Sequence, residues 1–213
     1  VKYNAYSGNG QSSLLQAVKT SIEKTYKSSM KADGQVIVIS FTDGIVFELV
    51  PAFINKDNSY TFADTNNGGS WKTTNPKPEI AEMTAKNILW NRNLKRLCRM
   101  ARAWKYKWDV PMGGLLIDTL AYNFMKGCAY KDKSYLYYDF ISRDFFKFLS
   151  EQNSEQNYWL SPGANQYVWR KGKFEYKAKQ CYNIALEAIA KEKDYPTTAK
   201  SKWREIYGTK FPS

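Results

Sequence analysis

Apolar positions in the first fifty residues follow first the spacing of a helix and then the spacing of strands. Ser12 can cap a helix, because the apolar residues after it recur at helical intervals, at Leu14, Leu15, Val18, Ile22 and Tyr26. Residues 35–41 form a nearly continuous apolar run, which predicts a buried strand. Asp43-Gly44 is a hairpin-turn signal, so residues 45–50 are predicted to form the return strand, with Val46, Glu48 and Val50 on one face.

The segment that follows, residues 55–72, is rich in Asn, Asp, Gly and Ser and is predicted to be a loop. A two-stranded hairpin is only marginally stable by itself. The apolar strand at 35–41 therefore needs further strand partners, and we expect these to lie upstream of the first residue.

From Glu79 onward the pattern is helical to the end of the chain. Within residues 91–108 one stripe is apolar and the roughly opposite stripe is basic, with Arg92, Lys95, Arg96, Arg99 and Arg102. Further helices are predicted over residues 115–125, from Ser134 to 149, over 174–193, and in a last short helix that ends at Gly208. The sequence therefore predicts an α+β fold in two parts. Residues 1–75 contain a helix and a β-hairpin, and residues 76–213 are mostly helical.

The composition excludes several kinds of chemistry. The 213 residues contain no His, which removes Ser-His-Asp and Cys-His nucleophiles and most zinc or iron sites. The three cysteines, Cys98, Cys128 and Cys181, lie far apart and indicate neither a disulfide framework nor a zinc site. Catalysis would have to use carboxylates, a hard cation such as Mg²⁺, and basic side chains.

The charge balance and the N-terminus bear on partners and location. Lys and Arg outnumber Asp and Glu by 32 to 20, a net charge of +12. This favours a polyanionic partner, although a basic surface without such a partner is the alternative. No run approaches the roughly 18 apolar residues of a membrane span. Residues Val1–Asn4 show neither a signal peptide nor an initiating Met. We expect a cytoplasmic protein whose chain begins inside a longer reading frame or has been processed.

One carboxylate, Glu48, stands inside the apolar run of the second strand. Burying it is costly unless it is paired, hydrogen-bonded or bound to a cation. The alternative is a half-exposed sheet face on which Glu48 meets water. Because Mg²⁺ that bridges phosphates needs at least one or two carboxylates beside the substrate oxygens, Glu48 alone is weak evidence for a catalytic site.

Several blocks of sequence, in a fixed order, carry a family resemblance. They are Gly8-Asn9-Gly10-Gln11-Ser12-Ser13-Leu14-Leu15, Phe47-Glu48-Leu49-Val50-Pro51-Ala52-Phe53, Gly68-Gly69-Ser70-Trp71-Lys72-Thr73-Thr74-Asn75-Pro76, Leu94-Lys95-Arg96-Leu97-Cys98-Arg99-Met100-Ala101-Arg102-Ala103-Trp104 and Tyr167-Val168-Trp169-Arg170-Lys171-Gly172-Lys173-Phe174. Together they resemble the bacterial cyclic-oligonucleotide synthases, the CD-NTases with a SMODS nucleotidyltransferase domain, which are related to cyclic GMP-AMP synthase and oligoadenylate synthetase. The resemblance covers essentially the whole chain.

The resemblance implies a polymerase-β-like nucleotidyltransferase lobe and a helical lobe that enclose a nucleotide cleft. Members join nucleoside triphosphates into cyclic di- or trinucleotides, typically in antiphage defence operons. Three acidic residues hold two Mg²⁺ ions, with Mn²⁺ as an alternative, and Glu48 matches the third acid. The first two belong to a Gly-Ser and Asp-x-Asp segment that this sequence does not contain. Residues 1–75 then correspond to the C-terminal part of the nucleotidyltransferase lobe.

The resemblance also implies nucleotide-binding residues, namely Trp71, Lys72, Thr73, Asn75, Arg102 and Lys105. For Trp71 the alternative is packing on its own lobe, and for Asn75 it is a helix cap. Arg102 is the favoured triphosphate contact because it lies nearest the apolar edge of the basic stripe, and Lys105 follows on the same reasoning.

The chain departs from the family at two of its positions. Arg102 stands where the family usually has Lys, which changes a point ammonium into a planar fork. Gly114 stands where Ser is common, so that one expected hydroxyl contact to phosphate is in doubt. Lys171, Lys173 and Lys177 form a second basic cluster, which either flanks the cleft or is exposed without a role.

Three functions stay open at this point. The first is an ATP-binding, Mg²⁺-dependent nucleotidyltransferase for which the 213 residues form an incomplete enzyme that is inactive alone. The second is a non-catalytic nucleotide- or RNA-binding remnant, or a half-protein that pairs with a separate piece. The third is a basic RNA-binding domain. The first implies nucleoside triphosphates and a regulatory protein of a defence operon as partners; nucleic acid is less favoured, and no membrane is expected.

Overall fold

The computed structural model describes residues 8–209, 211 and 212. It divides into two compact units, Val1–Pro76 and Lys77–Ser213. The residues on which the expectation about a signal peptide rests, Val1–Asn4, lie outside the described part. Within the described part, no helix combines the length and the apolar character needed to cross a bilayer.

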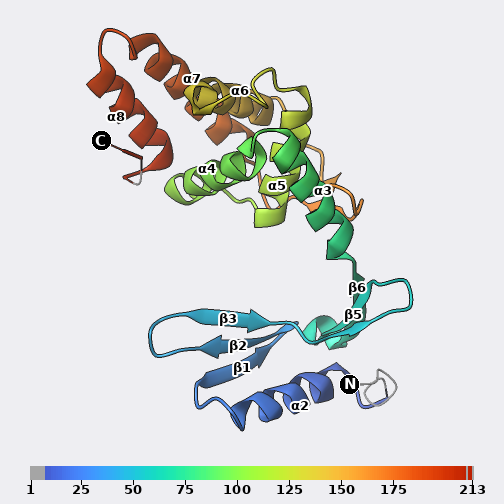
Figure 1. The fold of residues 1–213 in the computed structure, drawn as a ribbon. Helices are drawn as coiled ribbons and strands as arrows, with labels where there is room; N and C mark the ends of the chain where they lie inside the picture. The colour runs from blue at the N-terminus through green and yellow to red at the C-terminus, as the bar shows by residue number, and fades with distance from the viewer. Residues whose placement is uncertain (1–7, 210, 213) are drawn as a thin grey trace. The chain divides into compact units, whose positions relative to one another are not determined.

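The first unit contains a helix and two small antiparallel sheets (Figure 1). Helix α2 (Gln11–Glu23) precedes strands β1 (Ser29–Asp33), β2 (Val36–Ser40) and β3 (Val46–Leu49), which pair in the order β1-β2-β3. The predicted pair of strands is confirmed, but its connection is one residue longer than expected. Phe41 pairs with Ile45, so Thr42, Asp43 and Gly44 form the loop, and Gly44 takes a φ of 84° that a residue with a Cβ rarely adopts.

Two predictions for this unit are wrong. Strand β1 lies within the chain, so β2 has a partner on both sides without any upstream residue. Residues 55–72 are not a loop, because strands β4 (Ala52–Ile54), β5 (Tyr60–Asp64) and β6 (Ser70–Thr74) form a second sheet in that order. The Asn-, Asp- and Gly-rich composition belongs to the turns at 55–59 and 65–69, including a 3₁₀ turn at Asn66–Gly68, and it masked the Tyr, Thr and Phe of the strands.

Helix α2 covers one face of this unit. Its Leu14 and Leu15 are 2 % exposed and pack with the alternate residues Ile37 and Ile39 of β2, and the cluster also takes in Phe53 of β4 and Ala63 of β5. Because strand side chains alternate between faces, the residues between Ile37 and Ile39 and their neighbours on β1 and β3 lie on the face that α2 does not cover.

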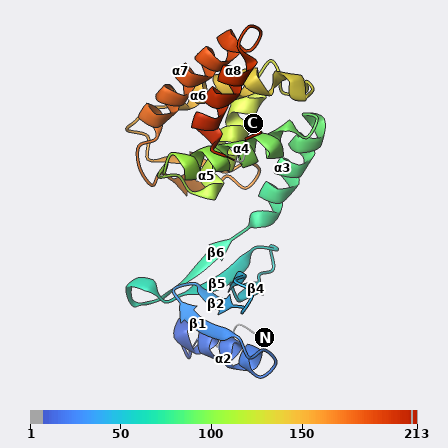
Figure 2. The same ribbon diagram turned by 90° about the vertical axis from the view of Figure 1, so that its left-hand side faces the viewer.

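The second unit is mostly helical (Figure 2). Its helices are α3 (Pro76–Leu89), α4 (Asn93–Lys107), α5 (Gly114–Gly127), α6 (Tyr138–Ser150), α7 (Glu175–Lys191) and α8 (Pro196–Tyr207), with a 3₁₀ turn at Tyr135–Tyr137. The expectation of helix to the end of the chain is wrong in one place: β7 (Tyr158–Leu160) and β8 (Tyr167–Trp169) form an antiparallel hairpin between α6 and α7.

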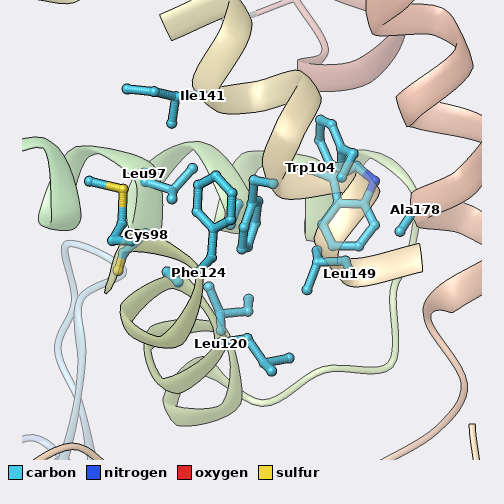
Figure 3. Close-up of a cluster of buried hydrophobic side chains, with 14 of the residues drawn as sticks. Leu97, Cys98, Trp104, Leu120, Phe124, Ile141, Leu149 and Ala178 are labelled. Carbon is cyan, nitrogen blue, oxygen red and sulfur yellow. The ribbon is translucent and has the colours of Figure 1, made fainter. Parts of the chain in front are cut away.

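The apolar stripe predicted for α4 forms the centre of the second core. Trp104 is fully buried, packs edge-on against Phe146 at 5.3 Å between ring centroids, and donates its indole N–H to Cys181 Sγ at 3.1 Å. Figure 3 shows Trp104, Leu149 and Ala178 brought together from α4, α6 and α7. All three cysteines are buried and free. The mixed architecture confirms the predicted α+β class.

Candidate functional site

The predicted catalytic carboxylate lies on an exposed strand. Glu48 is in β3, directly opposite Val38 of β2, on the sheet face that α2 does not cover. All four residues of β3 are exposed, and β3 is an edge strand of its sheet in the described residues. Its carboxylate forms no ion pair or hydrogen bond with any described residue. In the described residues, Glu48 therefore lies on a sheet face that is open to water, which is the alternative stated in the sequence analysis.

A cavity of about 250 Å³ borders Glu48. Its other lining residues are apolar or aromatic: Ile22, Tyr26, Ile39, Phe41, Phe47 and Leu49. A triphosphate needs cations and hydrogen-bond donors, but no positively charged residue lines this cavity. The cavity is therefore unsuited to a nucleotide by its size and by its chemistry.

The other candidates of the first unit lie on β6, where consecutive side chains alternate between the two faces of the sheet. Trp71 pairs with Ala63 and Thr73 with Thr61, so they share the face of the buried core. Lys72 lies on the opposite face. One ligand bound to one face of this sheet thus reaches Trp71 and Thr73, or Lys72, but not all three.

Lys72 is held by a buried acid. Its ammonium forms an ion pair with Asp64, whose side chain is 3 % exposed. Asp64 also accepts hydrogen bonds from the Asn66 amide at 3.0 Å, from Asn66 Nδ2 at 2.8 Å and from Gln35 Nε2 at 3.1 Å. The bond from Lys72, followed by those from Asn66 and Gln35, lowers the pKa of Asp64 to about 2. In this geometry Lys72 balances a buried charge.

Trp71 and Asn75 show how the two alternatives stated above look in the structure. The Trp71 indole is half-buried and leans on the core of its own unit, with its ring centroid 6.0 Å from that of Phe53. Asn75 directly precedes the first residue of α3, but its Oδ1 is buried and accepts no hydrogen bond from a described residue. Its side-chain oxygen therefore does not cap α3.

In the second unit, Arg102 of α4 is paired with an acid of α5. Its Nη2 lies 2.7 Å from Asp118 Oδ2 and 3.5 Å from the Gly114 carbonyl, and its Nη1 donates to the Cys98 carbonyl at 3.1 Å. Arg102 and Gly114, two positions that differ from the family that the sequence resembles, thus lie against each other. The hydrogen bond that Arg102 donates to Asp118 raises the pKa of Arg102, which stays charged.

The surroundings of this pair are acidic and partly buried. Burial, and then repulsion from Asp118, raises the pKa of Glu79 in the first turn of α3. Asp118 Oδ1 is itself buried and has no hydrogen-bond partner in the described residues. Asp118 therefore has a second acid, Glu79, near it, and a phosphate that binds Arg102 has to share the guanidinium with Asp118.

Two lysines lie near this pair along the chain or in space. Lys105 follows Arg102 by one helical turn, is half-buried, and has its ammonium 5.1 Å from the Tyr106 ring centroid. Lys171 lies across Gly113, because a Cβ added at that glycine would stand 3.4 Å from Lys171 Cε. Gly113 is the N-cap of α5, and Gly114 is the first residue of that helix. Arg102 and Lys171 thus approach the same Gly-Gly dipeptide, whereas Lys177 donates to the Trp108 and Asp109 carbonyls at the end of α4.

The rest of the basic stripe has other surroundings. Arg96 donates to the Tyr138 hydroxyl at 2.9 Å. Arg96 and Arg99 line a cavity of about 790 Å³ between α4, α6 and α8, and neither Arg102 nor Lys105 belongs to it. Of the five stripe residues only Arg102 forms an ion pair with a described residue. This cavity is therefore separate from Arg102 and Lys105, the two residues of this helix that the sequence analysis selected.

The described residues contain no cluster of three or more Asp, Glu, Cys or His side chains placed to hold a metal ion. Glu48 has no second carboxylate beside it, so these residues do not by themselves fit the predicted pair of Mg²⁺ ions.

The sequence analysis did not identify Asp64 and Asp118, the two acids that form ion pairs with Lys72 and Arg102. Asp64 ends a strand that was expected to be loop, and Asp118 lies 16 residues beyond Arg102 on another helix. One signal was present for Asp118: it is the only acidic residue in the apolar helix Gly114–Gly127.

Comparison with known proteins gives a family match for the first part of the chain and a curated relative for most of it. Residues 1–87 match the Second Messenger Oligonucleotide or Dinucleotide Synthetase (SMODS) domain. A probable cyclic nucleotide synthase of Bacillus cereus (strain VD146) is 23 % identical over 182 residues, which cover 79 % of this chain and 52 % of that protein.

The solved structures show the same fold over a larger share of the chain. The cyclic AMP-GMP synthase DncV of Vibrio cholerae, bound to the linear intermediate 5′ pppA(3′,5′)pG, superposes with a TM-score of 0.73 at 16 % identity, over 92 % of this chain and 57 % of that one. Escherichia coli DncV, bound to 3′-deoxy GTP, gives a TM-score of 0.71 at 16 % identity, over 96 % of this chain and 59 % of that one.

The fold is therefore that of part of a polymerase-β-like nucleotidyltransferase with a helical lobe. With the SMODS match over residues 1–87 and the curated relative, this fold makes the chain similar to the bacterial CD-NTases. The chain spans about half the length of the relatives it matches.

Proposed function

We propose that the chain is part of an enzyme that joins nucleoside triphosphates into a cyclic di- or trinucleotide. In this proposal Glu48 is one of the metal-binding carboxylates, and Arg102 and Lys105 contact the triphosphate. Support comes from the SMODS match and from the similarity to DncV, structures of which contain ATP and GTP. Antiphage defence, a cytoplasmic location and a regulatory protein partner belong to the same proposal, by analogy with the family.

The observation that carries the proposal is the place of Glu48 on an open edge strand. Its neighbours Ile45, Val46, Phe47, Leu49 and Val50 are between 40 % and 57 % exposed. An exposed apolar edge strand invites a further strand. A strand from the rest of the nucleotidyltransferase lobe that pairs with β3 would cover these side chains and bring carboxylates beside Glu48.

The proposal includes Mg²⁺ only if such a strand supplies further carboxylates beside Glu48. The described residues lack a metal site, so two Mg²⁺ ions require carboxylates from outside them. When bound, such ions supply charge neutralisation of the triphosphate. This chain's own part is to supply one carboxylate, Glu48, and the cations Arg102 and Lys105.

Arg102 suits its proposed role by geometry, with one limit. A guanidinium presents five donors in a plane and binds phosphate oxygens in pairs. Asp118 and two carbonyls already accept from Arg102. A triphosphate thus binds to a guanidinium that is held in place beforehand, against the local repulsion of Asp118 and Glu79.

The test uses an intact protein that contains these residues together with the Gly-Ser and Asp-x-Asp segment. It is incubated with Mg²⁺ and the four nucleoside triphosphates, and phosphatase-resistant cyclic product is measured by mass spectrometry. We expect product from the intact protein, and loss of product by a factor of at least 100 in Glu48→Gln with an unchanged far-UV circular dichroism spectrum. Product that survives Glu48→Gln would remove Glu48 from the site.

A second candidate, a non-catalytic nucleotide-binding piece, is favoured by the isolation of Glu48 in the described residues. The 213-residue chain, incubated in the same way, separates the two. We expect it to form no product alone, and to restore product when a separately expressed N-terminal segment is added, if it is half of an enzyme. Nucleotide binding without product in every combination would support the second candidate.

A further inference from the structure

An exposed aromatic face lies on the β7–β8 hairpin of the helical unit. In the antiparallel register Tyr158 pairs with Trp169 and Leu160 with Tyr167, so these four side chains share one face. They are 42 %, 61 %, 48 % and 61 % exposed in that order. The alternate residues Trp159 and Val168 are buried in the core. Such a concentration of exposed rings on one small face marks a binding surface.

The three rings form one cluster. Tyr158 meets Tyr167 at right angles with 4.7 Å between ring centroids, and it lies 5.4 Å from Trp169. Trp169 is 6.0 Å from Tyr167. Rings that hold one another in place present a stiff surface, and a flat ligand that stacks on them orders few side chains.

The hairpin is fixed to its unit at both ends. The buried Arg170 pairs with Glu175 at 2.6 Å and donates to the Gln156 and Asn153 carbonyls. At the tip, Gly163 lies so close to α3 that a Cβ would stand 2.4 Å from the Pro78 carbonyl oxygen. The aromatic face is therefore preorganised.

The charge next to the face indicates what it binds. Arg170 is directed inward, and the next residue, Lys171, is exposed and forms no ion pair with a described residue. Lys171 lies across Gly113, whose neighbour Gly114 is contacted by Arg102. Lys171 follows Trp169 of the aromatic face by two residues, and it approaches the same Gly113-Gly114 dipeptide as Arg102. Rings and cations placed in this way match a flat base joined to phosphates, because bases stack on rings and phosphates pair with cations.

We infer that the aromatic face of the β7–β8 hairpin stacks the base of a nucleotide whose phosphates are bound by Lys171 and Arg102. The inference deepens the proposed function, on which it rests for the role of Arg102. It adds the residues that hold the base and a second phosphate ligand, Lys171.

The experiment measures the affinity of the 213-residue chain for ATP, GTP and inorganic tripolyphosphate by isothermal titration calorimetry. Tyr167→Ala removes one ring of the face, and Tyr195→Ala is the matched control, because it removes a tyrosine of similar exposure, 63 %, from the connection between α7 and α8. Thermal melts by circular dichroism show that each variant is folded.

We expect Tyr167→Ala to weaken ATP or GTP binding by about 5- to 150-fold, the effect of one stacked base, and to leave tripolyphosphate binding unchanged. Lys171→Ala weakens all three probes, and Tyr195→Ala changes none. Equal nucleotide affinities of Tyr167→Ala and Tyr195→Ala would overturn the inference, as would a change of oligomeric state in Tyr167→Ala without a change in nucleotide affinity.

The two proposals fail in different ways. One outcome is that Arg102→Ala abolishes tripolyphosphate binding while Tyr167→Ala changes no nucleotide affinity. In that case the phosphate assignment stands and the aromatic inference is wrong. If the 213-residue chain binds none of the three probes, the inference is overturned, whereas the proposed function is judged by product from the intact protein.

Discussion

Removal of the Arg102 side chain tests both the stability and the binding role of the Arg102–Asp118 pair. Arg102→Ala leaves Asp118 without its partner at 2.7 Å, and the other oxygen of Asp118 is already buried without a hydrogen bond in the described residues. The side chains are 37 % and 24 % exposed, so solvent screens the pair. The free energy of unfolding that Arg102→Ala loses therefore falls between the roughly 0.2–1 kcal/mol of an exposed ion pair and the roughly 3–5 kcal/mol of a broken buried ion pair. We expect Arg102→Ala to lower the free energy of unfolding by about 1–2 kcal/mol.

The measurement is urea unfolding followed by far-UV circular dichroism, with tripolyphosphate affinity measured on the same preparations. Arg99→Ala is the matched control, because Arg99 lies one helical turn earlier on α4 and forms no ion pair with a described residue; its change should stay within about 0.5 kcal/mol. The double variant Arg102→Ala/Asp118→Asn removes the unpaired charge and should recover about half of the lost stability or more.

Binding distinguishes the two roles of Arg102. If Arg102 contacts phosphate, the double variant regains stability but not tripolyphosphate affinity. If Arg102 only neutralises Asp118, the double variant regains both, and the phosphate assignment is refuted. An unchanged unfolding midpoint in Arg102→Ala would refute the magnitude argued from the geometry.

Three further predictions follow from the same structure. Trp104→Ala removes a fully buried ring and should lower the free energy of unfolding by about 3–5 kcal/mol in urea titrations. The pKa of Asp64, lowered to about 2, implies a contribution to stability that is present above about pH 4, the pKa in an unfolded chain, and is lost as the pH falls toward 2; Lys72→Met should raise that pKa when carboxyl carbons are titrated by NMR. Gly163→Ala combines a φ of 70° with a clash against the Pro78 carbonyl and should lower stability by about 1–3 kcal/mol in thermal or urea melts.

The helices could be predicted because their patterns are long. In α4 the apolar positions Leu94, Leu97, Cys98, Ala101 and Trp104 recur over about three turns, and all are buried. Short strands give weaker signals. Strand β1 has the sequence Ser-Met-Lys-Ala-Asp, with few residues that favour strands, and it exists because β2 pairs with it across a tight turn. Strands β5 and β6 were hidden by the turn residues on either side of them.

The candidate residues could be named from the sequence, but their arrangement could not. Motif blocks identify Trp71, Lys72 and Thr73 together, yet a strand directs neighbours to opposite faces, and only the observed pairing shows which face each takes. The partners of the basic residues come from other elements, so no local spacing reveals that Asp64 holds Lys72 or that Asp118 holds Arg102. Whether Lys72 and Arg102 are already paired with an acid therefore depends on the tertiary structure.

The presence of Arg instead of Lys at position 102 follows from this tertiary setting. An ammonium places all its donors on one nitrogen, and next to Asp118 that nitrogen would be held by the acid. A guanidinium spreads five donors over three nitrogens, and here Nη1 binds the Cys98 carbonyl while Nη2 binds Asp118 and the Gly114 carbonyl. Gly114 has no side chain to compete for these donors. Arg102 and Gly114, the two positions that differ from the family that the sequence resembles, therefore act together: the guanidinium satisfies Asp118, and no side chain at Gly114 covers it.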